Sequence, residues 1–304
     1  MLPLTRTANH RGYNFMTTLL HLCAGVSLFL VAAVNANAAD TTGIQEGEQS
    51  CCRQDEDIAR WHRNADRLYG QFKAREAIKE LQKILEVDAR NFDALIKMAR
   101  AYIDVGDMIP ESGANWKERK LKQYRIAEDY ARRALKVNAN STWSHFWLAA
   151  ALGNAAIVSS TARQLELANQ IRARIEKAIA LDPENGLAYH AYGVWHRKVA
   201  EIGAASRAFA SVLYGHSVPT GSLEKSIEFL KRAVELNPTV IVSRLELARS
   251  YIARGDWEPA RALLRSISDL PIQFSDDNKH KQQAAQLLAE VGGRSPHNAP
   301  VAFS

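Results

Sequence analysis

Motifs for catalysis and for metal binding are missing from this chain of 304 residues. Its nine histidines are scattered, and none of them occurs in an H-E-x-x-H motif or at a Cys/His spacing suited to a metal ion. His190 and His196 are six positions apart and so face different sides of a helix. Neither the G-x-S-x-G motif of many hydrolases nor a glycine-rich phosphate-binding loop is present. We therefore predict no enzymatic activity, no cofactor and no metal site.

Acidic residues are absent from the first 39 positions, and the first acid is Asp40. Basic residues precede an apolar run from Leu19 to Val34, which is followed by Ala36-Asn37-Ala38. This order is typical of a secretory signal peptide, so we predict that residues 1–39 are a cleaved leader and that the protein is exported, periplasmic or secreted. A membrane anchor at residues 17–34 is the alternative, although a run of about 16 residues is shorter than the roughly 20 that a spanning helix needs.

Strong charge imbalance is also lacking. Removal of residues 1–39 leaves 37 basic and 33 acidic residues, because the leader contains two basic residues and no acid. So small an excess of basic residues is not typical of nucleic-acid-binding proteins, and we predict no nucleic-acid partner. Residues 40–56 are polar, and we interpret them as a flexible linker. Cys51 and Cys52 are adjacent and poorly placed to bond to each other, which leaves an intermolecular disulfide or an inert pair as alternatives.

What the chain does contain is a helical pattern with regular breaks, seen most clearly at residues 240–268. The apolar side chains at helical spacing are Leu247, Ala248 and Tyr251 before a break at Gly255-Asp256, and Trp257, Ala260 and Leu264 after it. Two apolar stripes around a two-residue turn predict an antiparallel pair of helices. Ala248 and Ala260 are small enough to let the two backbones approach. The order of residues also fits one repeat of the tetratricopeptide (TPR) type.

The same pattern recurs upstream, with similar endings. The phrases LEVDA, LKVNA, IALDP and VELNP end helical stretches near residues 89, 139, 183 and 238. Each phrase places Asp or Asn after an apolar helix end, where one helix stops and the next begins. We therefore predict an all-α, TPR-like α-solenoid of about five helical hairpins at residues 57–291. Its last helix, from residue 276 on, would act as a C-terminal cap, and residues 292–304 would form a disordered tail.

Two insertions between paired helices are informative. Residues 103–124 contain Pro110, Gly113 and a Lys/Arg-rich run at 117–122, which predict a loop followed by an exposed helix. Residues 199–222 carry only two charged side chains, which is unusual for a long surface segment. That segment either packs against its own hairpin, folds over the groove or contacts a hydrophobic ligand.

A solenoid of this type binds partners through the groove formed by the first helix of each hairpin, on the stripe opposite the contact with the second helix. The predicted partner-binding residues are Arg100, Trp147, Asn154, His190, Arg197, Lys198 and Arg249. The four basic side chains would suit an anionic partner, such as an acidic segment, a peptide carboxylate or a lipid phosphate. The alternative is that these arginines pair with neighbouring acids such as Glu246 or Asp104.

Three stretches resemble the TPR domain of the regulator of microtubule dynamics family. They are WSHFWLAAALG at 143–153, IEKAIALDPENGLAYHAYGVWHRKVAEI at 175–202 and SLEKSIEFLKRAVELNP at 222–238. The resemblance covers roughly residues 57–291. It implies an all-helical adaptor associated with microtubules or membrane contacts and, in one branch, phospholipid binding.

Two functions are therefore open. The first is a non-catalytic scaffold that recognises an acidic or helical segment of a partner protein in the solenoid groove. The second is a lipid-binding TPR module acting at membranes, with residues 203–218 lining a cavity for a phospholipid. The sequence leaves the oligomeric state undetermined.

Overall fold

The computed structural model describes residues 42–203, 206, 208, 212 and 219–294. The expected leader at 1–39, the alternative anchor at 17–34 and most of the expected tail lie outside these residues. Contacts divide the chain into residues 1–50 and 51–304, and the packing described below is that of the second unit. Of the helices in the described part of the chain, none combines the length and the hydropathy needed to cross a membrane.

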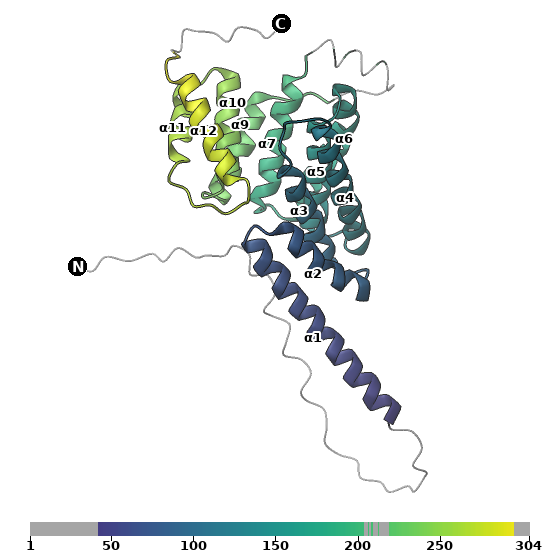
Figure 1. Cartoon of the computed structure of the whole chain (residues 1–304). Coiled ribbons are helices and arrows are strands. Elements are labelled where there is room, and N and C mark those ends of the chain that lie inside the picture. The colour runs from purple at the N-terminus through teal and green to yellow at the C-terminus, as the bar shows by residue number, and fades with distance from the viewer. Residues whose placement is uncertain (1–41, 204–205, 207, 209–211, 213–218, 295–304) are drawn as a thin grey trace, which may run out of the picture. The chain divides into compact units, whose positions relative to one another are not determined.

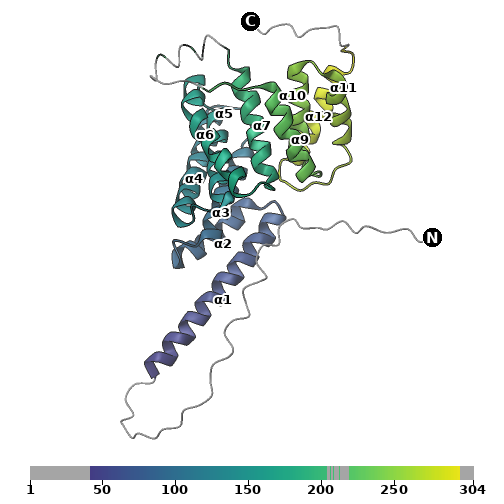
Figure 2. The same cartoon turned by 180° about the vertical axis from the view of Figure 1, so that it is seen from behind.

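The regular secondary structure of the described residues consists of helices, without strands (Figure 1, Figure 2). In chain order they are α1 (Thr42–Gly70), α2 (Ala74–Val87), α3 (Phe92–Asp107), α4 (Trp116–Val137), α5 (Thr142–Ile157), α6 (Thr161–Leu181), α7 (Gly186–Glu201), α9 (Leu223–Leu236), α10 (Ile241–Arg254), α11 (Trp257–Ser266) and α12 (Asp277–Val291). Helices α3 and α4, α5 and α6, α7 and α9, and α10 and α11 pack as pairs, and α12 packs on α10 and α11. The first pair is α1 and α2, which share a core cluster through Ala65 on α1 and Ala77 and Leu81 on α2. The predicted five hairpins and capping helix are confirmed.

The recurring phrases end helices as predicted. Asp88, Asn138, Asp182 and Asn237 are the C-caps of α2, α4, α6 and α9, and the backbone N–H of each donates to the carbonyl four residues earlier. The next first helix then begins within a few residues. Asn91 and Asn185 cap α3 and α7 with side-chain oxygens that accept from the N–H three residues on. At the fifth hairpin, Gly255 has φ +87°, a left-handed conformation that glycine adopts without steric cost.

Small side chains let neighbouring helices approach, as expected. Ala248 and Ala260 are fully buried. Gly193 on α7 allows an even closer contact with α9. A Cβ at this position would lie 2.4 Å from Leu230 Cγ and 2.9 Å from the Ser226 carbonyl oxygen. Ser226 Oγ, itself buried, donates a 2.7 Å hydrogen bond to the Gly193 carbonyl at the same crossing.

An aromatic stack beside this crossing encloses a histidine. His196 is 5% exposed, and its ring lies 4.8 Å from Tyr192 and 5.5 Å from Phe229, measured between ring centroids. Among the described residues, neither ring nitrogen of His196 has a hydrogen-bond partner. Burial lowers the pKa of His196 to about 4, so the ring is neutral at physiological pH. His196 is thus a buried side chain packed among aromatic rings.

Two details differ from the sequence-based expectation. Residues 42–56, expected as a flexible linker, belong to helix α1, which also contains Cys51 and Cys52. The stretch has no proline and many good helix formers, so a polar composition is compatible with a helix as well as with a loop. The exposed helix expected within residues 103–124 is present as the first part of α4, but it is not exposed throughout. Lys120 is 4% exposed and donates to Glu111 at 2.9 Å.

Candidate functional site

The first helices of successive hairpins contact one another, α3 with α5, α5 with α7 and α7 with α10. We use the term inner face for the side of these helices that carries the seven predicted partner-binding residues. Arg100 lies on α3, Trp147 and Asn154 on α5, His190, Arg197 and Lys198 on α7, and Arg249 on α10. The structure gathers most of these side chains into two clusters.

The first cluster surrounds Glu246 on α10. Arg197 donates to Glu246 from the neighbouring hairpin and, at 2.7 Å, to Glu201 on its own helix. Arg249 also donates to Glu246, and its second nitrogen donates to Gln283 of α12 at 3.0 Å. Arg197 is 4% exposed and Glu246 is 7% exposed. The cluster therefore joins the fourth hairpin, the fifth hairpin and the capping helix through a buried carboxylate.

The ionisable groups of this cluster act on one another's pKa values. Burial alone would raise the pKa of Glu246, but the Arg197 and Arg249 guanidiniums outweigh it and lower that pKa to about 2. His190, on the same helix as Arg197, lies 3.2 Å from Ser243 Oγ through its Nδ1 atom. Burial lowers the pKa of His190 to about 4, against the attraction of Glu246. At neutral pH the cluster thus holds a carboxylate, two guanidiniums and a neutral imidazole.

The predicted basic groove is consequently not formed by these two arginines. The internal pairing with Glu246, left open by the sequence, is what the structure shows. The prediction that Arg197 is an exposed anchor for an anion is wrong, because its guanidinium is buried and donates hydrogen bonds to Glu201 and Glu246. Arg249 is more accessible, but it shares the same carboxylate. Its contact with a partner stays a prediction.

The second cluster is centred on Arg100. Its guanidinium carbon lies 4.0 Å from the ring centroid of Tyr69, 5.9 Å from that of Phe274 and 6.0 Å from that of Trp147. These aromatic residues come from α1, from the segment before α12 and from α5. A guanidinium at such distances interacts favourably with ring faces, and a planar cation can also bind a carboxylate. Sequence analysis identified Arg100 and Trp147 but not Tyr69 or Phe274.

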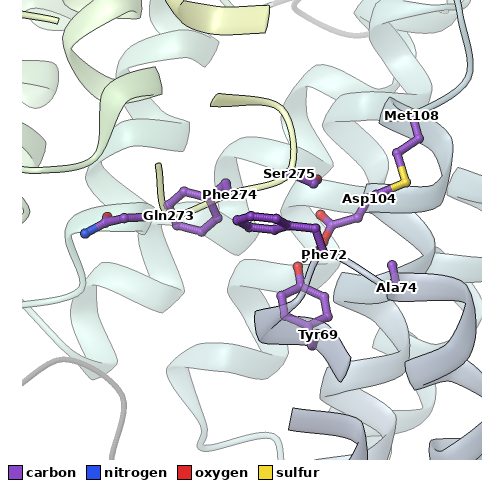
Figure 3. Close-up of a pocket in the computed structure, with 8 residues that line it drawn as sticks. All are labelled: Tyr69, Phe72, Ala74, Asp104, Met108, Gln273, Phe274 and Ser275. Atoms are coloured by element: carbon purple, nitrogen blue, oxygen red, sulfur yellow. Dashed lines mark hydrogen bonds between the residues drawn. The ribbon is translucent and has the colours of Figure 1, made fainter. Parts of the chain in front are cut away.

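Two carboxyl groups lie near the Arg100 cluster, and Figure 3 shows one of them, Asp104, next to Tyr69. Tyr69 donates to Asp104, and Tyr124 of α4 donates to Asp107 at 2.6 Å. Burial raises the pKa of Asp104 well above its usual value, and Asp107 and Asp276 raise it further. Burial likewise raises the pKa of Asp107 to about 6, although the hydrogen bond from Tyr124 opposes the shift. Both carboxyl groups therefore take up a proton at a higher pH than an exposed aspartate does.

The remaining predicted residues do not join either cluster. Asn154 donates to the Ala150 carbonyl of its own helix at 3.1 Å. Lys198 is exposed and lies 3.3 Å from Glu201, one turn away. Pairs of this kind on a solvated helix contribute little to stability, so Lys198 is available to exchange partners.

One group of side chains has the composition of a metal site. Potential ligand atoms of Asp276, Asp277 and His280 lie within 4.8 Å of one another. Asp277 Oδ2, however, accepts from the backbone N–H groups of Gln273 and Phe274, at 2.7 and 2.8 Å. This carboxylate already accepts the hydrogen bonds that hold the turn before α12, and we assign no ion to the group.

Comparisons with known proteins agree with this architecture. The family model described as "Regulator of microtubule dynamics protein 1-3" matches residues 61–292. Regulator of microtubule dynamics protein 1 from Bos taurus is 29% identical over 225 residues, which are 74% of this chain and 69% of the relative. The Homo sapiens protein of that name is 29% identical over 200 residues, 66% of this chain and 62% of the relative.

A likeness among solved structures supports the fold alone. The TPR protein TTC0263 of Thermus thermophilus matches with a TM-score of 0.53 at 16% identity, over 78% of this chain and 99% of that one. The TPR-like solenoid and the predicted family resemblance are thus confirmed. Because the family model spans the five hairpins and the capping helix, this chain belongs to the Regulator of microtubule dynamics protein 1-3 family.

Proposed function

We propose that this protein is a non-catalytic scaffold whose inner face binds a segment of a partner protein. A helical-repeat solenoid offers an extended surface for such segments. The observation that carries the proposal is the Arg100 cluster, where one cation lies among aromatic side chains from three separate parts of the chain. Aromatic residues and arginine are the side chains most enriched at the energetic centres of protein interfaces.

The chemistry of the cluster indicates what the partner segment carries. Arg100 and the rings of Tyr69 and Trp147 suit an aromatic or apolar side chain, with a carboxylate next to it as a second contact for the guanidinium. Four basic residues predicted an anionic partner, but this arrangement calls for only one or two acidic groups on the partner segment. We further propose that the partner is itself exported, on the strength of the leader sequence at residues 1–39.

The phospholipid alternative has less support from the described residues. The apolar segment at 203–218 that suggested it lies mostly outside them. The larger described cavity, about 300 Å³, is lined by Arg125, Glu128, Ser159 and Arg163 together with four smaller or apolar residues. Ligand pockets are about 300–1,000 Å³ and mostly apolar, so this cavity is small and polar for an acyl chain. Native mass spectrometry of the purified chain distinguishes the alternatives, since a co-purifying phospholipid mass would favour the lipid module.

The scaffold proposal is tested by affinity capture with the full chain as bait. We expect Arg100→Gln to lose bound partners about tenfold, the equivalent of roughly 1.4 kcal/mol. Arg132→Gln is the matched control, because Arg132 lies exposed on α4 and pairs with Glu128. Capture of the same proteins by both variants, at the level of the unmodified chain, would exclude the Arg100 cluster as the binding site.

A further inference from the structure

The segment between α11 and α12 lies against the first two hairpins. After α11 ends at Ser266, the chain continues without regular structure to Asp276. The backbone N–H groups of Gln273 and Phe274 both donate to Asp277 Oδ2, at 2.7 and 2.8 Å. This fixes the turn before α12. The Gln273 side chain donates to Thr239 Oγ1 at 3.0 Å, which ties the segment to the start of the fifth hairpin.

Phe274 is the residue of this segment that reaches the Arg100 cluster. Its ring lies 5.9 Å from the Arg100 guanidinium carbon. Together with Gln273 and Ser275 it encloses a cavity of about 10 Å³ against Tyr69, Phe72 and other residues of α1 to α3 (Figure 3). Phe274 thus occupies a position where a partner's aromatic side chain would meet Arg100.

The contact is shallow. Phe72 and Met108, which line it, each remain 41% exposed, and Ile272 of the segment is 38% exposed. Lys279, just after the segment, lies 3.3 Å from Glu111, but both side chains are about half exposed. Exposed ion pairs of this kind contribute little.

Like charges also oppose the contact. Asp276 of the segment lies close enough to Asp104 and Asp107 to raise the pKa of both carboxyl groups. Because a segment held by shallow apolar contacts meets carboxylates of its own sign, it can leave without disturbing the buried core of the hairpins.

We propose that residues 272–276 are an intramolecular ligand, which occupies the inner face beside Arg100 and is displaced when a partner binds there. The inference rests on the proposed function and refines it in two ways. The partner segment would present an aromatic residue to Arg100 at the position that Phe274 occupies. Partner binding would be weakened by competition with the chain's own segment.

Tethering sets the size of that competition. The effective concentration of a segment on a short tether is on the order of 1 mM, so a free peptide with a Kd of about 0.1 mM would be weakened about tenfold by the attached copy. Removal of the Phe274 ring should abolish the competition while leaving Tyr69 and Arg100 in place.

The test uses a fluorescent synthetic peptide of residues 268–278 and measures its anisotropy with the full chain. We expect Phe274→Ala to bind the peptide about tenfold more tightly than the unmodified chain. Ile272→Ala is the matched control, since it removes an exposed apolar side chain of the same segment that does not line the cavity, and it should bind like the unmodified chain. A peptide with alanine in place of its phenylalanine should bind neither protein.

Each outcome decides the question. Equal peptide affinity for the unmodified chain and Phe274→Ala would overturn self-occupancy, as would absence of binding to a Phe274→Ala protein that melts cooperatively. Addition of Arg100→Gln to Phe274→Ala should remove the gained binding, and retention of it would place the peptide elsewhere. If peptide binding behaves as expected but affinity capture yields no Arg100-dependent protein, then the scaffold proposal fails and the intramolecular contact stands.

Discussion

Replacement of Arg197 by methionine tests whether the Glu246 cluster stabilises the stack. Methionine preserves much of the length of the arginine side chain but removes its charge and donors. Glu246, which is 7% exposed in the unmodified chain, would then keep Arg249 as a cationic partner in the cluster. The substitution also cuts the ion pair that joins α7 to α10, and thus the fourth hairpin to the fifth.

The pKa of Glu246 gives the size of the effect. It is lowered from 4.5 to about 2, and each unit corresponds to about 1.4 kcal/mol. In these surroundings the ionised Glu246 therefore contributes roughly 3 kcal/mol to the free energy of unfolding at pH 7, because the two arginines more than offset the cost of its burial. Arg197 lowers the pKa of Glu246 more than Arg249 does. In other proteins, loss of one partner of a buried ion pair costs about 3–5 kcal/mol. We expect Arg197→Met to destabilise the protein by about 2–4 kcal/mol.

The effect is measured by urea denaturation followed by circular dichroism, with a double-mutant cycle to Glu246→Gln. We expect a coupling energy of about 2 kcal/mol between the two positions. The lowered pKa means that the stabilisation by Glu246 is complete above pH 4.5 and is lost as the pH falls through about 2. The difference between the unmodified chain and Arg197→Met should therefore shrink over that range. A loss below about 1 kcal/mol at pH 7, with additive single effects, would refute the reasoning.

Three further substitutions and one matched control test the packing. His196→Phe keeps the aromatic stack but removes a group whose pKa is lowered to about 4, so it should stabilise the protein by about 2 kcal/mol more at pH 5 than at pH 7.5, measured by urea denaturation. The sign follows because the unfolded chain binds a proton below pH 6.5 that the folded chain excludes. Gly193→Ala should lower the thermal midpoint, because its Cβ would meet Leu230 and Ser226, at a cost of roughly 1–3 kcal/mol. Gly153→Ala is its matched control within helix α5, where a Cβ meets nothing within 4 Å, and it should raise the midpoint by the equivalent of up to about 1 kcal/mol. Gly255→Ala should destabilise by about 1 kcal/mol in the same assay because φ is +87°.

The repeat architecture could be predicted from local patterns because each hairpin is specified by local signals. Asp or Asn after an apolar helix end, alanine at the helix contacts and Gly255 at a turn all act within one hairpin or between neighbours. Because such features repeat, a helix end that is misplaced in the prediction of one hairpin can be corrected by comparison with the others. Residues 42–56 belong to no repeat, and there composition alone was a poor guide to helix formation.

The candidate site could be predicted only in part because its charges depend on neighbours from other hairpins. Arg197 lies on the correct helix and faces α10, but its position in the sequence does not reveal that Glu246 occupies the space opposite it. Phe274 has no repeat pattern around it, and Leu270-Pro271 shows only where the last hairpin ends. Its contact with Arg100 joins positions 174 residues apart, which local reasoning does not detect.

That contact changes how the stability of this solenoid is expected to behave. In a simple repeat protein each hairpin contacts its neighbours alone, so stability is a sum of hairpin and interface contributions. Here the segment before α12 contacts residues of α1 and α3, and Arg249 connects α10 with α12. Phe274 therefore links the first hairpins to the capping helix across the hairpins between them. Because the same ring lies beside Arg100, a partner that displaces it would also loosen the cap, and ligand binding and C-terminal stability would then be opposed rather than cooperative.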